Sequence, residues 1–141
     1  MYLDSAYIAK YYVNEPDAAA VRNLIRRAPF VCSSAWALVE VTCVFHRHVR
    51  ERSLTLAQGR ELIDVFRRHA EKDVWHLIPL TEELLRRTAT LIRGIPAGVP
   101  LRAGNAIHLA SALAVGELEM WTNDRHLLAA AAHFGVTARS I

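Results

Sequence analysis

The chain contains little lysine, little cysteine and no long apolar run. Lys10 and Lys72 are its two lysines, and Cys32 and Cys43 are its two cysteines. The cysteines do not form a C-x-x-C pair, so neither a zinc cluster nor a disulfide framework is indicated, and we expect a reducing, cytoplasmic location. No stretch of about 18 residues is uninterruptedly apolar, and the first residues lack the pattern of a signal peptide, so we expect no membrane association.

The composition otherwise indicates one globular domain with an arginine-rich surface. At 141 residues, of which 52 % are hydrophobic, the chain can bury a core of its own, and we expect a single domain over residues 1–141. Fifteen of its seventeen basic residues are arginines, and the net charge is +3. Arginine suits phosphate recognition because its planar fork donates paired hydrogen bonds and stacks on bases. Solvated helix faces explain most of these arginines as well, so the charge is compatible with nucleic acid binding without establishing it.

Short β-like segments alternate with longer helical ones. We expect strands at 1–3, 30–32, 74–78, 119–122 and 136–140, and helices at about 5–12, 16–27, 35–52, 55–71, 81–92, 101–115 and 124–133. Thr55, Thr81 and either Asn123 or Asp124 are candidate N-caps, while Gly116 and Gly135 are expected to end helices. This alternation predicts an α/β fold in which helices cover both faces of a parallel sheet.

Two aspartates stand at the ends of strands in the expected sheet. Asp4 follows the first strand and Asp124 follows the fourth, so in a parallel sheet both emerge at the edge where ligand crevices lie. Two carboxylates there repel each other unless a cation neutralises them, and hard oxygen ligands of this kind select Mg²⁺ or Mn²⁺ rather than zinc. Taken singly, each aspartate could equally be the N-cap of the helix that follows it.

Two other polar residues interrupt apolar helices. Glu40 is flanked by valines and lies close to the buried stripe of its helix, from which it could complete the acidic cluster. Asn105 has Leu101 and Leu109 as helical neighbours, so we expect its amide to point toward the apolar side, where an unpaired polar group costs about 1 to 3 kcal/mol. Asn105 therefore needs a partner or a ligand. His108, one turn away, is a candidate partner, although a buried structural histidine is the preferred interpretation.

Four segments carry these residues in a specific order: YLDSA at 2–6, SSAWALVEV at 33–41, LRAGNAIHLA at 101–110 and TNDRHL at 122–127. Each is weak alone, but in order and spacing they resemble PIN domain ribonucleases over the whole chain, in particular the VapC-type toxins of toxin–antitoxin pairs. The resemblance implies a PIN-like three-layer α/β/α sandwich with a mainly parallel sheet of about five short strands. It also implies an RNA substrate, a VapB-like antitoxin partner and a homodimer.

The resemblance assigns roles to six residues. It implies catalytic positions at Asp4, Glu40, Asn105 and Asp124, a Mg²⁺ or Mn²⁺ ion bound by Asp4, Asn105 and Asp124, and accessory groups at Ser5 and Thr122. The metal would activate a water molecule for in-line attack on an RNA phosphodiester. Asn105 departs from the family pattern, which has a fourth acidic residue there, and the lost negative charge predicts weaker metal binding and strongly reduced cleavage.

Two other functions stay open at this stage. A catalytically silent PIN-fold module that binds RNA or an antitoxin is favoured by Asn105 itself. A phospho-acceptor receiver domain also places acids at strand ends, but it requires paired acids after the first strand and a lysine after the last. This chain has only Asp4 at the first position and no lysine beyond Lys72.

Overall fold

The computed structural model describes residues 1–141 as five strands, seven α-helices and one 3₁₀-helix. The strands are β1 (Tyr2–Leu3), β2 (Cys32–Ser34), β3 (His76–Ile78), β4 (Glu119–Trp121) and β5 (Thr137–Arg139). The α-helices are α1 (Ser5–Tyr12), α2 (Ala18–Arg27), α3 (Ala37–Arg50), α4 (Leu56–Glu71), α5 (Glu82–Arg93), α6 (Ala103–Ala114) and α7 (Arg125–Ala130), and the 3₁₀-helix is η1 (Ala131–Phe134). None of the helices combines the length and the hydrophobicity that a membrane-spanning segment requires.

The five strands form one sheet in the order β3-β2-β1-β4-β5, and every neighbouring pair is parallel. The chain moves outward from β1 through β2 to β3, then returns to the other side of β1 for β4 and β5. The strand order therefore reverses between β1 and β4, where Tyr2 pairs with Met120 and Leu3 with Trp121. In open α/β sheets this switch point is where ligands bind, outside the carboxyl ends of the strands.

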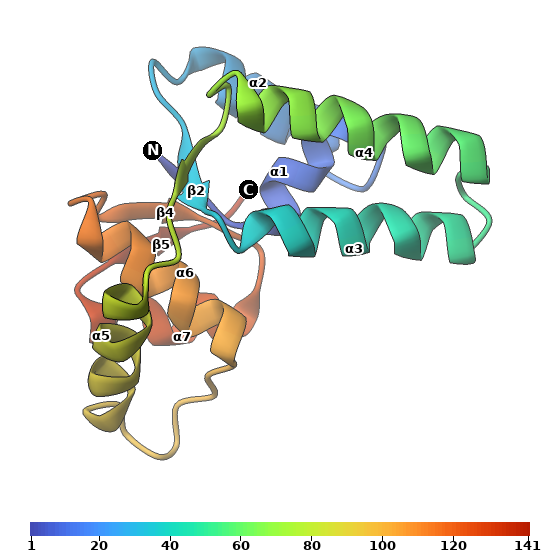
Figure 1. Ribbon diagram of the computed structural model, residues 1–141. Coiled ribbons are helices and arrows are strands. Elements are labelled where there is room, and N and C mark those ends of the chain that lie inside the picture. The colour runs from blue at the N-terminus through green and yellow to red at the C-terminus, as the bar shows by residue number, and fades with distance from the viewer.

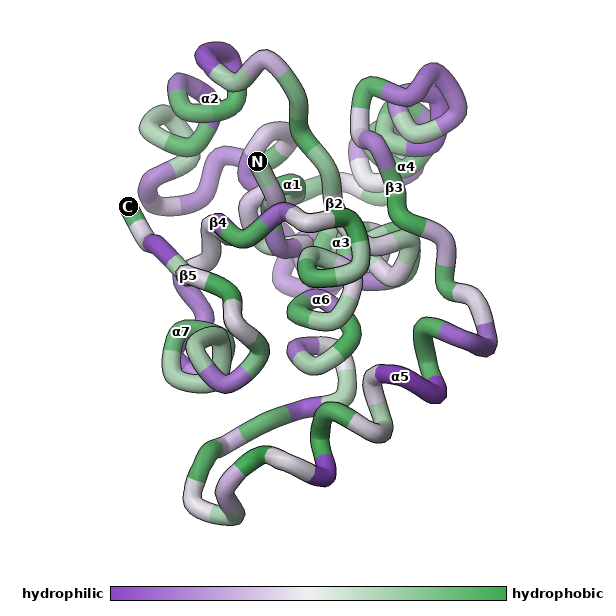
Figure 2. The backbone as a smooth tube through the Cα atoms, turned by 90° about the vertical axis from the view of Figure 1, so that its left-hand side faces the viewer, coloured by the Kyte–Doolittle hydropathy of each residue, from purple (hydrophilic) through white to green (hydrophobic).

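Helices cover both faces of the sheet, as the alternating pattern predicts (Figure 1). Side chains of successive strand residues point to opposite faces. Tyr2 accordingly packs into a core formed with α6, α7 and η1, and Leu3 packs into a second core formed with α1 to α4. Hydrophobic segments gather centrally around β2 and α6, while hydrophilic stretches lie on the peripheral helices α2, α4 and α5 (Figure 2). The predicted three-layer α/β/α sandwich is confirmed.

The helix ends follow the predicted local signals. The side chains of Thr55, Thr81 and Asp124 each accept hydrogen bonds from backbone N–H groups in the first turn of α4, α5 and α7. Such caps satisfy donors that the helix itself leaves unpaired. Gly116 and Gly135 follow helix ends with φ of 72°, a backbone conformation that costs glycine little.

Other boundaries differ from the prediction because long-range contacts decide them. The second strand lies at Cys32–Ser34 rather than 30–32, since Ser33 pairs with Leu77 and donates its hydroxyl to the Leu3 carbonyl at 2.8 Å. The following helix consequently begins at Ala37 instead of Ala35. The second helix begins at Ala18, because Asp17 has a left-handed φ of 66°.

Candidate functional site

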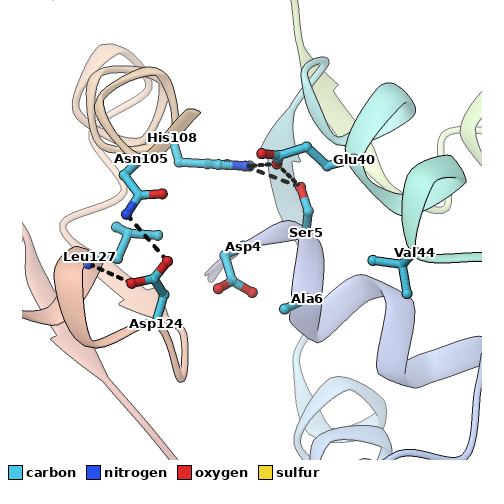
Figure 3. Close-up of a pocket in the computed structure, with 9 residues that line it drawn as sticks. All are labelled: Asp4, Ser5, Ala6, Glu40, Val44, Asn105, His108, Asp124 and Leu127. Atoms are coloured by element: carbon cyan, nitrogen blue, oxygen red, sulfur yellow. Dashed lines mark hydrogen bonds and ion pairs between the residues drawn. The ribbon is translucent and has the colours of Figure 1, made fainter. Parts of the chain in front are cut away.

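A cavity of about 200 Å³ lies at the carboxyl ends of β1 and β4 (Figure 3). It is lined by Asp4, Ser5, Ala6, Glu40, Val44, Asn105, His108, Asp124 and Leu127. The fold thus brings the four predicted catalytic residues and Ser5 together from α3, α6 and the two strand ends. Thr122, the second predicted accessory residue, is fully buried behind Asp4.

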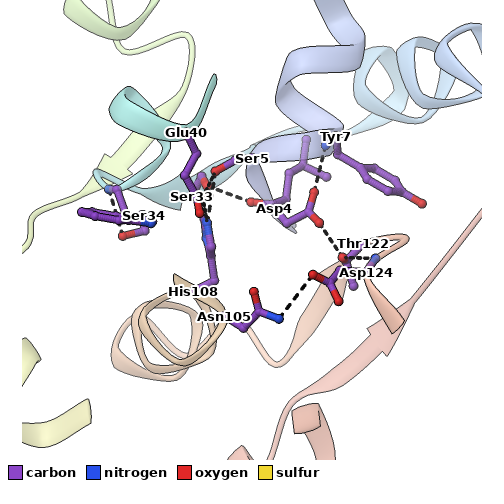
Figure 4. Close-up of polar contacts among 12 residues, drawn as sticks. Asp4, Ser5, Tyr7, Ser33, Ser34, Glu40, Asn105, His108, Thr122 and Asp124 are labelled. Atoms are coloured by element: carbon purple, nitrogen blue, oxygen red, sulfur yellow. Dashed lines mark hydrogen bonds and ion pairs between the residues drawn. The ribbon is translucent and has the colours of Figure 1, made fainter. Parts of the chain in front are cut away.

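Asp4 both caps a helix and faces the cavity, so its role as an N-cap does not exclude the predicted role as a metal ligand. Its Oδ1 accepts the backbone N–H of Tyr7 at 2.8 Å, and its Oδ2 accepts the Thr122 hydroxyl (Figure 4). The residue is 4 % exposed. Burial raises the pKa of this carboxyl, and the hydrogen bonds from Thr122 and Tyr7 offset the increase only in part. A nearby cation would therefore stabilise the ionised form of Asp4.

Asp124 divides its two oxygens between a helix cap and the cavity. Oδ1 accepts the backbone N–H groups of His126 at 2.7 Å and Leu127 at 3.3 Å, which caps α7. Oδ2 accepts the side-chain amide of Asn105 at 3.3 Å. Partial burial by itself would raise the pKa of Asp124, but these hydrogen bonds outweigh it and the pKa is lowered. Asp124 is thus held as a carboxylate that presents one oxygen to the site.

Glu40 is oriented from two sides. Ser5 donates its hydroxyl to Glu40 Oε2 at 2.6 Å, and His108 Nε2 lies 2.8 Å from the same oxygen. Burial alone would raise the pKa of Glu40, but the hydrogen bonds from His108 and Ser5 lower it below its ordinary value. Because both contacts use Oε2, neither Ser5 nor His108 occupies the second oxygen of the carboxylate.

His108 is the site residue whose role the sequence did not reveal. It is 2 % exposed, and its ring lies between Tyr2 and Glu40, with Nδ1 2.8 Å from the Tyr2 hydroxyl. A carboxylate only accepts, so Nε2 must carry the hydrogen that binds Glu40. The predicted alternative, a hydrogen bond with Asn105, is wrong, and the preferred interpretation as a buried histidine is confirmed. The partners are far apart in sequence, so no local pattern could identify them.

Asn105 does not point into the apolar core, which corrects the sequence-based expectation. It lies in the first turn of α6, half-buried at the edge of the cavity, while the neighbouring Ala106 and Leu109 face the core. Its amide is paired with Asp124. The expected partner therefore exists, and it is a carboxylate of the same site.

The lining of the cavity is acidic. Three carboxylates line it, and neither lysine nor arginine does. Their hard oxygens match Mg²⁺ or Mn²⁺ in kind, and Asp4 is buried with no lysine or arginine beside it in the cavity lining. No group of three or more His, Cys, Asp or Glu side chains is arranged to hold a metal ion as the structure stands. The donor set thus fits a divalent cation in chemistry, and its side chains would have to move to enclose one.

Comparison with known proteins identifies the family of this chain. The structure resembles that of the Mycobacterium tuberculosis toxin VapC20, described as cleaving the sarcin–ricin loop, with a TM-score of 0.70 and 14 % sequence identity over 92 % of this chain and 93 % of that one. At this identity the similarity shows the fold. A search of curated protein sequences found no significant match. The family model described as "PIN domain" matches residues 1–133, and the predicted resemblance is confirmed: the chain belongs to the PIN domain family.

Proposed function

We propose that this protein is a divalent-metal-dependent endoribonuclease of the VapC type, the toxin of a toxin–antitoxin pair, and that Asn105 weakens it. Family membership supports a nuclease. The observation that carries the proposal is the convergence of Asp4, Glu40, Asn105 and Asp124 in one cavity at the switch point of the sheet. A VapB-like antitoxin, a homodimeric state and a cytoplasmic location belong to the same proposal.

Asp4, Asp124 and the amide oxygen of Asn105 are the groups that would hold Mg²⁺ or Mn²⁺. The bound ion would supply an activated water molecule and offset charge on the RNA phosphate. Glu40 is suited to a different task, since Ser5 and His108 fix its Oε2. Its other oxygen can accept a proton from the attacking water, because the lowered pKa keeps the carboxylate ionised at neutral pH.

Asn105 acts on this site in two ways. It contributes no negative charge, and its N–H occupies an oxygen of Asp124 that a cation would otherwise use. The Asn105 amide therefore gives Asp124 Oδ2 a hydrogen-bond partner in the absence of metal. Both effects weaken metal binding, so slow cleavage is expected of the chain as it stands.

Cleavage of a structured RNA in Mg²⁺ or Mn²⁺ tests the proposal. The native protein should cut slowly, the Asn105→Asp variant should cut faster, and adding Asp4→Asn to that variant should abolish the gain. Asn23→Asp, the same substitution on the exposed face of α2, is the matched control and should leave the rate unchanged. Equal rates for the native protein and Asn105→Asp would contradict the role given to Asn105, and cleavage that survives Asp4→Asn would contradict the site.

A second candidate function is a catalytically silent module that keeps the PIN fold and binds RNA or an antitoxin. The hydrogen bond from Asn105 to Asp124 favours it, because this bond completes the site without a cation. Absence of cleavage by both the native protein and Asn105→Asp in Mn²⁺, together with retained RNA or antitoxin binding, would select this function. The receiver-domain alternative is not retained, since the chain belongs to the PIN family.

A further inference from the structure

The catalytic cavity is too small for more than the reacting part of a polymer. Its volume of about 200 Å³ falls below the ~300–1,000 Å³ of typical ligand pockets. It can admit a phosphodiester group, but the flanking nucleotides must lie outside it. A neighbouring surface should therefore receive them.

A second, larger depression of about 530 Å³ adjoins the cavity along α3, and we name it the α3 groove. It is lined by Trp36, Val39, Glu40, Cys43, Val44, His46, Arg47 and Arg50. Glu40 and Val44, both labelled in Figure 3, also line the catalytic cavity, so the two depressions adjoin at these residues. The lining residues recur every three or four positions and thus share one face of the helix, over a length of about 20 Å.

Two arginines supply positive charge at the far end of the α3 groove. The side chains of Arg47 and Arg50 are 46 % and 67 % exposed. Arg47 binds Glu15 through one nitrogen at 2.8 Å, which anchors the guanidinium and leaves its other N–H donors available. Arg50 lies 3.6 Å from Glu51, an exposed pair of little energetic value that a phosphate can replace. The one carboxylate in the groove is Glu40, at the catalytic end.

An aromatic and apolar surface occupies the other end of the α3 groove. Trp36 lines it beside Glu40, and its buried indole N–H lies next to the Glu40 carboxylate. Val39 is 52 % exposed on the same face. Aromatic side chains next to a positively charged groove are the combination by which proteins bind single strands, since bases stack on the rings while cations contact the phosphates.

We infer that the α3 groove binds the single-stranded RNA segment adjoining the scissile phosphate, with a base stacked on Trp36 and backbone phosphates bound by Arg47 and Arg50. The inference rests on the proposed function, because the strand in the groove is the one that enters the catalytic cavity. It adds a substrate-binding surface outside the acidic residues.

Binding can be measured without cleavage, by fluorescence anisotropy of a labelled single-stranded RNA of about ten nucleotides, within the ~4–16 nucleotide range of such sites. The assay contains EDTA, so a catalytically silent protein is tested equally well. Trp36→Ala should weaken binding about tenfold while Trp36→Phe retains most of it. Arg50→Gln should lower the slope of log affinity against log salt by about 0.7, the value for one phosphate contact with a single strand.

Arg86→Gln is the matched control, because Arg86 is an exposed, ion-paired arginine on α5 in the opposite layer. It should leave the salt slope and affinity nearly unchanged. Circular dichroism of each variant separates loss of binding from loss of fold. RNA binding that is the same in the native protein, Trp36→Ala and Arg50→Gln would overturn the inference and point to a protein partner for the groove.

Cys43 offers a test on the native protein. It is exposed and lines the α3 groove, whereas Cys32 is buried with its pKa raised by burial to about 11, so a bulky maleimide should label Cys43 selectively. Saturating RNA should slow this labelling several-fold. An unchanged labelling rate at saturating RNA would contradict the inference, even if RNA cleavage itself is observed.

Discussion

Replacing Asn105 by aspartate should destabilise the metal-free protein and create a strong response to Mg²⁺. Asn105 Nδ2 lies 3.3 Å from Asp124 Oδ2, so the new carboxylate would face an existing one at about this distance. Their repulsion is about 1 kcal/mol in a water-like environment and about 5 kcal/mol at the effective dielectric of a protein surface. The side chain of Asp124 is 37 % exposed, so solvent screening keeps the repulsion in the lower part of this range, at about 1–3 kcal/mol. With the lost hydrogen bond, worth about 1 kcal/mol, the total is about 2–4 kcal/mol.

Thermal unfolding in EDTA measures this destabilisation, and thermal unfolding in a Mg²⁺ titration measures how far the metal offsets it. For a chain of this size about 1 kcal/mol shifts Tm by roughly 4 °C, so Asn105→Asp should unfold on the order of 10 °C below the native protein without metal. Mg²⁺ at about 100 times its Kd contributes ~2.7 kcal/mol and should close most of the gap, with a smaller effect on the native protein. Asn23→Asp on α2 should show neither effect.

The loss of stability caused by Asn105→Asp in the absence of metal should also decrease as the pH falls. Repulsion raises the pKa of one carboxyl of the pair in the folded state, so the penalty is present at neutral pH and disappears as the pH falls below the ordinary carboxyl range. Equal stability of Asn105→Asp and the native protein in EDTA, or an equal response of both to Mg²⁺, would refute the reasoning.

Three further substitutions probe the frame of the site. His108→Ala removes the hydrogen-bond donor to Glu40 and should lower the free energy of unfolding by about 2 kcal/mol. In the Asn105→Asp background it should also slow cleavage. An unchanged cleavage rate would contradict the role of His108 in positioning Glu40. Gly104→Ala places a Cβ 2.8 Å from Glu40 Oε1 and should therefore reduce cleavage. It should not lower Tm, because alanine favours a helix by about 1 kcal/mol relative to glycine. Gly98→Ala is the control, since a Cβ there has no atom within 4 Å. Thr55→Ala breaks the capping box of α4 and should lower stability by about 1 kcal/mol in chemical denaturation while cleavage stays the same.

Features set by neighbouring residues were predictable from the sequence. The caps at Thr55, Thr81 and Asp124 connect groups two or three positions apart, so the signal and its partner lie in the same short segment. The alternation of strand and helix follows from hydrophobic periodicity in the same way. Strand limits were less accurate, because a residue such as Ser33 joins the sheet through its pairing with β3 and its bond to Leu3, which are distant in sequence.

The sequence by itself determined the PIN fold and the positions of its acids, since Asp4 and Asp124 come directly after strands whose carboxyl ends must share an edge. The tertiary structure alone decided what these groups contact. The packing of α6 over the sheet turns Asn105 toward Asp124 rather than the core. It also places His108 against Glu40, 68 positions away, and against Tyr2, 106 positions away. Such contacts depend on how helices and strands pack in space, which leaves no trace in local periodicity.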